Sequence, residues 1–185
     1  MHNLLRRMII AAIRNEKEME KALLSGVETI FYLSPNILTL EGIVEKVHKV
    51  GKKIFLHMDL AEGLGKDKAG MEYVKQKGVD GIISTRVSMI KAAREVGLFT
   101  VQRFFIVDSQ SVSTTLEGIK ASKPDMIEIM PGIATKVIAD LKTKLNVPII
   151  AGGMIESRME ARDALLNGAT AVSTSKRELW GKSKS

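Results

Sequence analysis

The sequence predicts a compact (βα)8 barrel of the TIM type, with parallel strands and short loops. Eight short apolar runs recur about every 20–25 residues, and all but the last are followed by a segment with helical periodicity. Several of these segments end in a glycine. Eight alternating units favour a closed barrel over an open sheet. The chain of 185 residues is short for this fold, which commonly needs about 250 residues.

The apolar runs predict strands that are covered on both faces, because most of them are continuous rather than alternating. In chain order, the predicted strands span residues 8–13, 29–33, 53–59, 81–85, 100–107, 125–130, 147–151 and 169–174.

The segments between the strands predict amphipathic helices at residues 16–24, 40–50, 66–77, 87–96, 115–121, 134–145 and 156–166. A glycine suited to a left-handed helix cap follows several of them, at Gly26, Gly51, Gly78, Gly97 and Gly168. Each unit has about 23 residues, so we expect a trimmed barrel with one degenerate helix. A single domain is predicted over residues 1–185, with a frayed tail at 181–185.

The composition is that of an ordinary globular protein, with 45% hydrophobic and 26% charged residues. The absence of cysteine excludes a disulfide scaffold, a thiolate metal site and a cysteine nucleophile. The apolar run at 8–13 follows Arg6 and Arg7 but is much shorter than the roughly 20 residues of a membrane span. We therefore expect a cytoplasmic protein without a membrane partner. The net charge of +7 suits an anionic partner, although lysine-rich surfaces often serve solubility alone.

Two polar segments near the end of the chain predict a phosphate-binding site. Gly152 and Gly153 follow the seventh predicted strand, and Ser173, Thr174 and Ser175 end the eighth. Barrels of this type often bind phosphate between these two loops, where glycines let backbone N–H groups approach the anion and a helix start adds further donors. The alternative is that the glycines form a tight turn and the serines cap a helix.

Other polar side chains lie at the carboxyl ends of predicted strands, where a barrel binds its ligands. We expect ligand contacts from these positions, at Arg14, Asp59, Arg86, Gln102 and Glu128. Arg103 also needs an anion, a carboxylate partner or water near the barrel mouth.

Two features of the third strand and its loop allow other interpretations. His57 and Asp59 lie two residues apart and form a candidate acid–base pair, although a histidine on a barrel strand is more often a packed residue. In the glycine-rich turn that follows, Lys66 is a candidate counter-charge for a ligand. Alternatively, the turn only places Asp67 as the cap of the next helix. Three histidines are too few for a multi-histidine site, and no metal site is predicted.

Several motifs in register resemble the glycerol uptake operon antiterminator regulatory proteins. They cover residues from about 8 to 180, and they are IAAIR at 10–14, IFLHMDL at 54–60, GLGKD at 63–67, GIISTR at 81–86, QRFF at 102–105, DS at 108–109, PDMIEIMPG at 124–132, PIIAGG at 148–153, AVSTS at 171–175 and LW at 179–180.

The resemblance implies a barrel-shaped regulator that responds to glycerol 3-phosphate, binds the leader of glycerol-catabolism messenger RNA and prevents premature termination of transcription. It implies that Gly152, Gly153 and residues 173–175 hold the phosphate, whereas Arg14, Asp59, Gln102 and Glu128 face the glycerol end. No catalytic residue and no cofactor besides this effector are expected, and a homo-oligomer is compatible with the sequence.

The rival interpretation is a barrel enzyme, an isomerase or lyase acting on a small phosphorylated metabolite, with His57, Asp59 or Glu128 as acid–base groups. RNA recognition itself is not visible, because the chain has no standard RNA-binding motif and only 4% aromatic residues. Basic residues near the two termini, Arg6, Arg7, Lys176, Arg177, Lys182 and Lys184, would form an RNA surface if the ends lie close together; alternatively, they are merely solvated.

Overall fold

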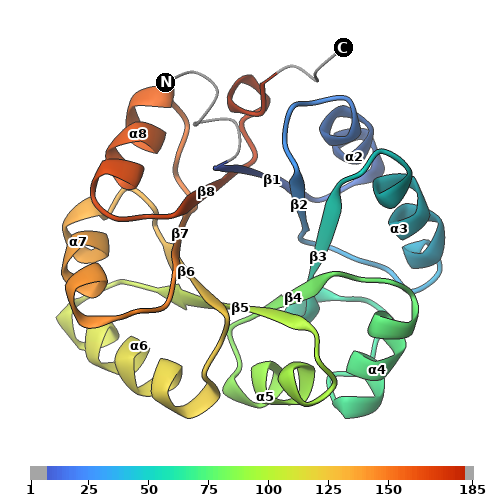
Figure 1. The fold of residues 1–185 in the computed structure, drawn as a ribbon, viewed down its shortest axis with the longest axis horizontal. Coiled ribbons are helices and arrows are strands. Elements are labelled where there is room, and N and C mark those ends of the chain that lie inside the picture. The colour runs from blue at the N-terminus through green and yellow to red at the C-terminus, as the bar shows by residue number, and fades with distance from the viewer. Residues whose placement is uncertain (1–7, 182–185) are drawn as a thin grey trace.

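The computed structural model describes residues 8–181, and these form a closed barrel of eight parallel strands. Each strand pairs with the next one along the chain, and the last closes the ring against the first (Figure 1). The predicted fold class is therefore confirmed. The strands are β1 (Ile9–Ile13), β2 (Thr29–Tyr32), β3 (Lys53–His57), β4 (Gly81–Ser84), β5 (Phe99–Phe105), β6 (Met126–Met130), β7 (Ile149–Gly152) and β8 (Ala171–Thr174).

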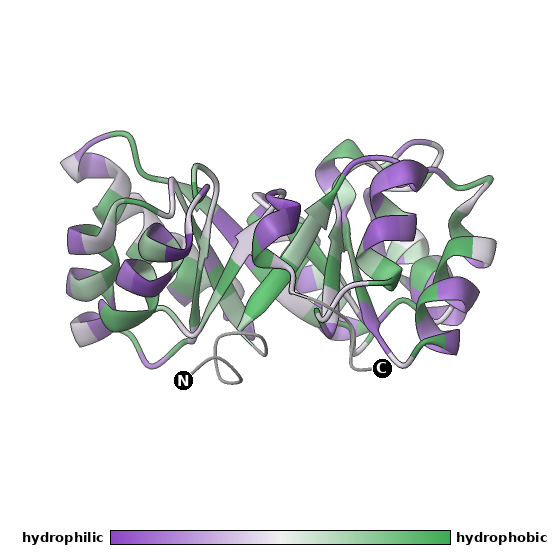
Figure 2. Ribbon diagram, turned by 90° about the horizontal axis from the view of Figure 1, so that it is seen from above, coloured by the Kyte–Doolittle hydropathy of each residue, from purple (hydrophilic) through white to green (hydrophobic). Residues whose placement is uncertain are grey.

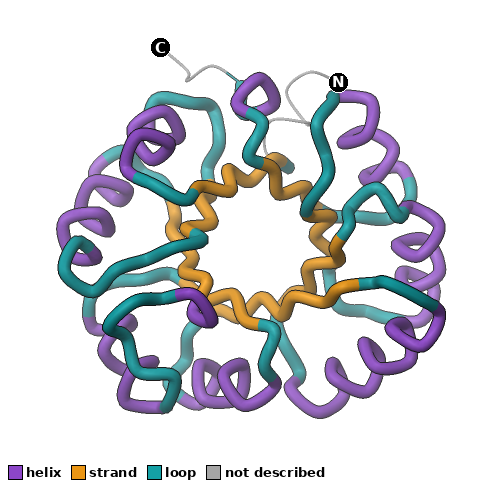
Figure 3. The backbone as a smooth tube through the Cα atoms, turned by 180° about the vertical axis from the view of Figure 1, so that it is seen from behind, coloured by secondary structure: helices purple, strands orange, loops and turns teal. Residues whose placement is uncertain are grey.

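Helices surround the strands as an outer ring, which is also visible from the opposite side of the barrel (Figure 3). The described residues contain seven α-helices, namely α2 (Glu16–Leu23), α3 (Leu40–Lys49), α4 (Lys68–Gln76), α5 (Val87–Glu95), α6 (Ser109–Ser122), α7 (Thr135–Lys144) and α8 (Arg158–Leu166). None of the helices within residues 8–181 is long and apolar enough to cross a membrane.

Most element boundaries lie within two residues of the sequence-based prediction, and the start of α6 is the exception. Helix α6 begins at Ser109 rather than at residue 115, because Asp108 accepts a hydrogen bond from the Ser111 backbone N–H and forms a capping box with it. Serine and threonine have modest helix propensity, which hid this first part of α6 in the sequence. Strand β3 ends at His57, and a 3-10 turn, η1 (Met58–Leu60), follows where the prediction extended the strand to residue 59.

The eighth helix is reduced to a single 3-10 turn, η2 (Arg177–Leu179), which lies between α8 and α2 in Figure 1. Trp180 follows η2, is 2% exposed, and donates a hydrogen bond from its indole Nε1 to the Thr174 carbonyl at 2.9 Å. One buried aromatic side chain therefore covers the barrel wall where a full helix would otherwise pack, as expected of a short chain with one degenerate helix.

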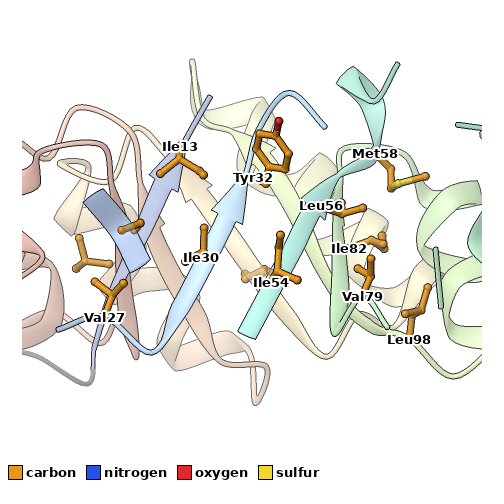
Figure 4. Packing of buried hydrophobic residues seen from close by; sticks show 14 of the residues in the cluster. Ile13, Val27, Ile30, Tyr32, Ile54, Leu56, Met58, Val79, Ile82 and Leu98 are labelled. Carbon is orange, nitrogen blue, oxygen red and sulfur yellow. The ribbon is translucent and has the colours of Figure 1, made fainter. Parts of the chain in front are cut away.

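The hydrophobic core has two layers, one on each side of the strands. The outer layer lies between strands and helices, and Figure 4 shows part of it, with Ile30, Ile54 and Ile82 on neighbouring strands. The inner layer fills the barrel with Ile10, Leu33, Val101 and other side chains. Burying one such side chain contributes about 1.5–3 kcal/mol. The strands are accordingly mostly hydrophobic along their length, whereas the helices mix hydrophilic and hydrophobic residues (Figure 2).

Strand register determines which polar side chains reach the barrel interior. Side chains alternate along a strand, so Val101 and Arg103 of β5 point inward whereas Gln102 points outward. Arg103 is the register partner of Glu128 on β6, and Ser173 on β8 pairs with Gly152 on β7. The inward residues Arg103, Glu128 and Ser173 are thus polar, and the apolar register partners Phe105 and Met130 follow at the ends of β5 and β6.

Candidate ligand site at the barrel mouth

A cavity of about 130 Å³ opens at the carboxyl ends of the strands, between β1 and β5–β8. This position is where barrels of this type bind their ligands. Its polar and glycine lining consists of Arg14, Arg103, Glu128, Gly153, Glu156, Ser173, Thr174, Ser175 and Lys176. We call this space the mouth cavity.

Beneath the mouth cavity lies a buried ionic group, the Glu128 cluster, which consists of Arg103, Glu128 and Ser173. The Arg103 Nε donates to Glu128 Oε2 at 2.6 Å, and the Ser173 hydroxyl donates to Glu128 Oε1 at 2.5 Å. Glu128 is 0% exposed and Arg103 is 8% exposed. Both carboxylate oxygens thus have a donor, as a fully buried charge requires.

Gly152 makes space for this cluster. A Cβ atom at this position would lie 2.3 Å from Glu128 Oε1 and 2.8 Å from the Ser173 Oγ. Gly152 does not itself line the mouth cavity, so its visible role is steric. Whether it also holds a phosphate stays a prediction. Gly153 does line the cavity and has a φ of +72°, in the left-handed region that favours glycine.

The loops after β7 and β8 are tied together by Thr174. Its hydroxyl donates to the Ile155 carbonyl at 2.7 Å and accepts from the Lys176 backbone N–H at 3.0 Å. The helix start that we expected after β8 is only the single turn η2, which is too short to provide a substantial dipole. Positive charge at this edge comes instead from the side chains of Arg14 and Lys176.

A second polar group, the Asp59 cluster, lies at the carboxyl ends of β3 and β4. Asp59 accepts hydrogen bonds from the Ser84 hydroxyl at 2.9 Å and the Thr85 backbone N–H at 2.7 Å. The His57 Nε2 lies 3.3 Å from Asp59 Oδ2 without hydrogen-bond geometry, and Arg86 Nε lies 3.6 Å from Oδ1.

Asp59 is held ionised by these neighbours. Burial by itself would raise the pKa of Asp59, but the proximity of His57 and the hydrogen bonds from Thr85 and Ser84 outweigh burial and hold the pKa well below its usual range. Neither Asp59 nor Arg86 lines the mouth cavity, and contact of these residues with the same ligand as the phosphate loops stays a prediction. Both side chains instead contact other residues at the β3–β4 edge.

Gln102 lies away from the barrel mouth, where we expected it to contact a ligand. Its side chain lies on the helix-facing side of β5, where its Oε1 accepts a hydrogen bond from the Ser122 hydroxyl of α6 at 2.5 Å. It is 1% exposed and faces away from the mouth cavity. The prediction placed Gln102 at the strand end without fixing its face, and a shift of one residue along a strand changes the face.

The structure also shows what Lys66 and Asp67 contact in the glycine-rich turn after β3. The Lys66 Nζ donates to the backbone carbonyls of Met58 and Ala61, so it braces the turn rather than facing the mouth cavity. Asp67 is the N-cap of α4 and accepts from the Gly70 N–H at 2.9 Å. The helix-cap interpretation of Asp67 is confirmed.

Six of the ten predicted site residues line the mouth cavity, namely Arg14, Glu128, Gly153, Ser173, Thr174 and Ser175. Sequence reasoning left Arg103 and Lys176 out of the predicted contacts. The signal for Arg103 was available, since Arg103 and Glu128 hold equivalent positions on adjacent predicted strands and carry opposite charges. Within residues 8–181, no group of three or more histidine, aspartate or glutamate side chains is arranged to hold a metal ion.

A closed parallel barrel whose carboxyl-end cavity combines cations, a left-handed glycine and serine hydroxyls defines a small-molecule-binding TIM barrel with features suited to an anion. Comparison with known proteins gives the family. Residues 9–180 match the family of glycerol-3-phosphate responsive antiterminators, and the chain belongs to that family.

Similar proteins span nearly the same length. The chain is 38% identical over 181 residues to the uncharacterized protein YgcP of Escherichia coli, covering 97% of this chain and 95% of that protein. The crystal structure of the glycerol uptake operon antiterminator regulatory protein of Listeria monocytogenes is 35% identical, with a TM-score of 0.88, and the match covers 93% of this chain and 94% of that one. A glycerol uptake operon antiterminator-related protein of Thermotoga maritima is 32% identical, with a TM-score of 0.84, covering 94% and 98%.

Proposed function

We propose that this protein is a glycerol 3-phosphate-responsive, RNA-binding regulator that acts as a transcription antiterminator for glycerol uptake and catabolism genes. Glycerol 3-phosphate is the effector and the leader of the messenger RNA is the partner. The protein acts in the cytoplasm, where that RNA is made. Membership in the antiterminator family supports this assignment, and so does the chemistry of the mouth cavity.

The observation that carries the proposal is the pairing of two kinds of group in one cavity. Gly153 and Ser175, which follow β7 and β8, lie with the cations Arg14 and Lys176 at its edge, and the buried Glu128 cluster forms its floor. The edge suits a phosphate, since backbone N–H groups and cations both favour an anion. The floor offers carboxylate and guanidinium groups that suit hydroxyls. Glycerol 3-phosphate has one phosphate and two hydroxyls, which matches this division.

We propose in addition that the protein has no catalytic step. Glu128 is the acidic side chain that lines the buried floor of the mouth cavity, and both of its oxygens already accept hydrogen bonds. Asp59 and His57, the other candidate acid–base pair, do not line this cavity. Turnover of glycerol 3-phosphate or a triose phosphate by the purified protein, abolished by E128Q, would establish the enzyme interpretation instead.

A thermal melt tests ligand binding directly. Protein is melted in parallel with glycerol 3-phosphate, glycerol and inorganic phosphate. A ligand at about 100 times its Kd stabilises the folded state by about 2.7 kcal/mol, which raises the Tm of a domain of this size by about 5–10 °C. We expect this shift with glycerol 3-phosphate and a much smaller one with either fragment. Equal shifts with glycerol 3-phosphate and phosphate would mean that the glycerol part is not recognised.

RNA binding is then measured with the ligand present. Affinity for the leader RNA is expected to fall steeply with salt, because phosphate contacts release counterions. It is also expected to rise with glycerol 3-phosphate, because an effector acts through a difference in affinity for two states. Salt-sensitive binding that is indifferent to glycerol 3-phosphate would retain the RNA partner and remove the response.

A further inference from the structure

A second cavity lies beside the mouth cavity, between the carboxyl end of β5 and the first turns of α6. Its volume is about 370 Å³, within the range of small-molecule sites. The groups used in the argument below are Arg103, Phe105, Asp108, Gln110 and Thr114, and we call this cavity the α6 pocket. None of the residue positions that the family resemblance assigns to the effector lies in it.

Arg103 connects the two cavities. It lines both the mouth cavity and the α6 pocket, and it is 8% exposed. Its Nε is bonded to Glu128, whereas its two terminal nitrogens have no hydrogen-bond partner among residues 8–181. A guanidinium carries five N–H donors, and the terminal nitrogens of Arg103 are not among the buried atoms that lack a partner, so solvent reaches them from the cavities. The terminal nitrogens are therefore suited to acceptor groups that enter from the two cavities.

The walls of the α6 pocket suit a nucleoside. Phe105 is 56% exposed and offers an aromatic face on which a base can stack. Gln110 contributes an exposed amide that can pair with the edge of a base. The Thr114 hydroxyl donates to the Gln110 carbonyl at 3.2 Å, and its oxygen can still accept from a base amine.

Asp108 favours the sugar and base over a phosphate. It already accepts from the Ser111 N–H and hydroxyl at 2.8 Å each, and hydrogen bonding from Ser111 holds the pKa of Asp108 below its usual value. A carboxylate in the wall repels a second anion but can still accept from a ribose hydroxyl or an exocyclic amine. Recognition of an unstacked base by aromatic and polar groups is typical of single-stranded RNA binding.

We propose that the α6 pocket binds one unstacked nucleotide of single-stranded RNA, and that Arg103 couples this nucleotide to the effector in the mouth cavity. This inference rests on the proposed function and specifies its RNA surface. An effector phosphate or hydroxyl that binds one edge of the guanidinium fixes its orientation and presents the other edge to the base. The nucleotide then meets a preorganised donor, so each ligand tightens the binding of the other by the same factor.

The pocket is tested with F105A, and F99A is the matched control. Phe99 is the exposed phenylalanine at the opposite end of the same strand, 41% exposed and outside the α6 pocket. Binding of a fluorescein-labelled, unstructured RNA of randomised sequence is measured by anisotropy with glycerol 3-phosphate present. Loss of one stacked base should weaken F105A about 5-fold to 150-fold, whereas F99A should match the unaltered protein.

Photo-crosslinking of thiouridine-substituted RNA gives an independent readout. We expect the crosslinked peptide to contain Phe105 or the first turn of α6, around Gln110. Unchanged RNA affinity in F105A, with crosslinks on another face of the barrel, would overturn the pocket while leaving the proposed function intact. If the unaltered protein bound neither this RNA nor the leader RNA at any effector concentration, the proposed function and the inference would both fail.

The coupling is tested at Arg103. R103K keeps a positive charge beside Glu128 but lacks the planar guanidinium, whose two terminal nitrogens can bind groups in both cavities. The factor by which glycerol 3-phosphate tightens RNA binding should fall to about one, while RNA still binds. The double variant R103M/E128Q removes both charges of the buried pair and replaces R103K if that variant is unstable. Because both residues line the mouth cavity, the RNA affinity of each variant is compared at a glycerol 3-phosphate concentration that its own thermal melt shows to be saturating. A full effector response in both variants would show that Arg103 is not the link.

Discussion

Two polar clusters lie at the same end of this barrel, and they differ in whether their side chains reach the mouth cavity. In the Asp59 cluster, each carboxylate oxygen is engaged by Ser84, Thr85, His57 or Arg86, and no residue of it lines the mouth cavity. In the Glu128 cluster both carboxylate oxygens also accept hydrogen bonds, and the side chain of Arg103 lines two cavities that are open to solvent. The Asp59 cluster stabilises the β3–β4 edge. The Glu128 cluster combines a fully paired carboxylate with the Arg103 guanidinium, whose N–H donors face two cavities.

The largest expected loss of stability comes from breaking the buried Arg103–Glu128 pair, and a surface ion pair serves as the comparison. E128A leaves Arg103 buried without its carboxylate and deprives Ser173 of its acceptor, so we expect a loss of about 3–5 kcal/mol in the free energy of unfolding, measured by denaturant titration. The control is E156A, whose partner Lys176 is 42% exposed, and it should cost less than about 1 kcal/mol. Similar losses in both variants would contradict the buried role of Glu128.

A smaller loss is expected from filling the space that Glu128 occupies. G152A would place a Cβ against Glu128 and Ser173, and overpacking of this kind costs about 1–3 kcal/mol. The matched control is G42A on the exposed side of α3, where a Cβ meets nothing within 4 Å and helix propensity should stabilise by about 0.5–1 kcal/mol. If G152A were as harmless as G42A in denaturant titration, Glu128 would have to be free to move.

The Asp59 cluster should affect acid stability and not effector binding. The pKa of Asp59 is depressed in the folded state, so its stabilisation is present at neutral pH and is lost as the pH falls below about 4. D59N should lower the free energy of unfolding by about 1–3 kcal/mol at pH 7 and flatten its decline below pH 4. The Tm shift with glycerol 3-phosphate should stay unchanged. A lost shift with a native-like melt would place Asp59 in ligand binding.

The smallest effect on stability is expected at the edge of the mouth cavity. K176A breaks a solvent-exposed pair with Glu156 and should change the free energy of unfolding by less than about 1 kcal/mol. It should nevertheless weaken glycerol 3-phosphate about 5-fold in calorimetry at low salt, because a cation near the phosphate is lost, and less so at high salt. K144A, on the outer helix α7, removes the same charge and should leave the affinity unaltered.

The sequence carried enough information for the barrel, because hydrophobic periodicity reports whether a segment is covered on one face or two. It located the mouth residues after β1, β6, β7 and β8 for the same reason. It could not assign Gln102 to the outer face, because that depends on a register that one residue can invert. It also could not separate Asp59 from the mouth cavity, because both clusters consist of polar residues at strand ends and only their hydrogen-bond partners distinguish them.

The reduced final helix gives the molecule an optical reporter of its own. Trp180 is the one tryptophan of the chain, and its indole is bonded to the carbonyl of Thr174, whose side chain ties together the loops after β7 and β8. Indole emission depends on the polarity and hydrogen bonding around the ring, so a shift of these loops on effector binding would change its wavelength or intensity. Binding of glycerol 3-phosphate can thus be followed in unlabelled protein, at a position where other barrels carry an unremarkable helix.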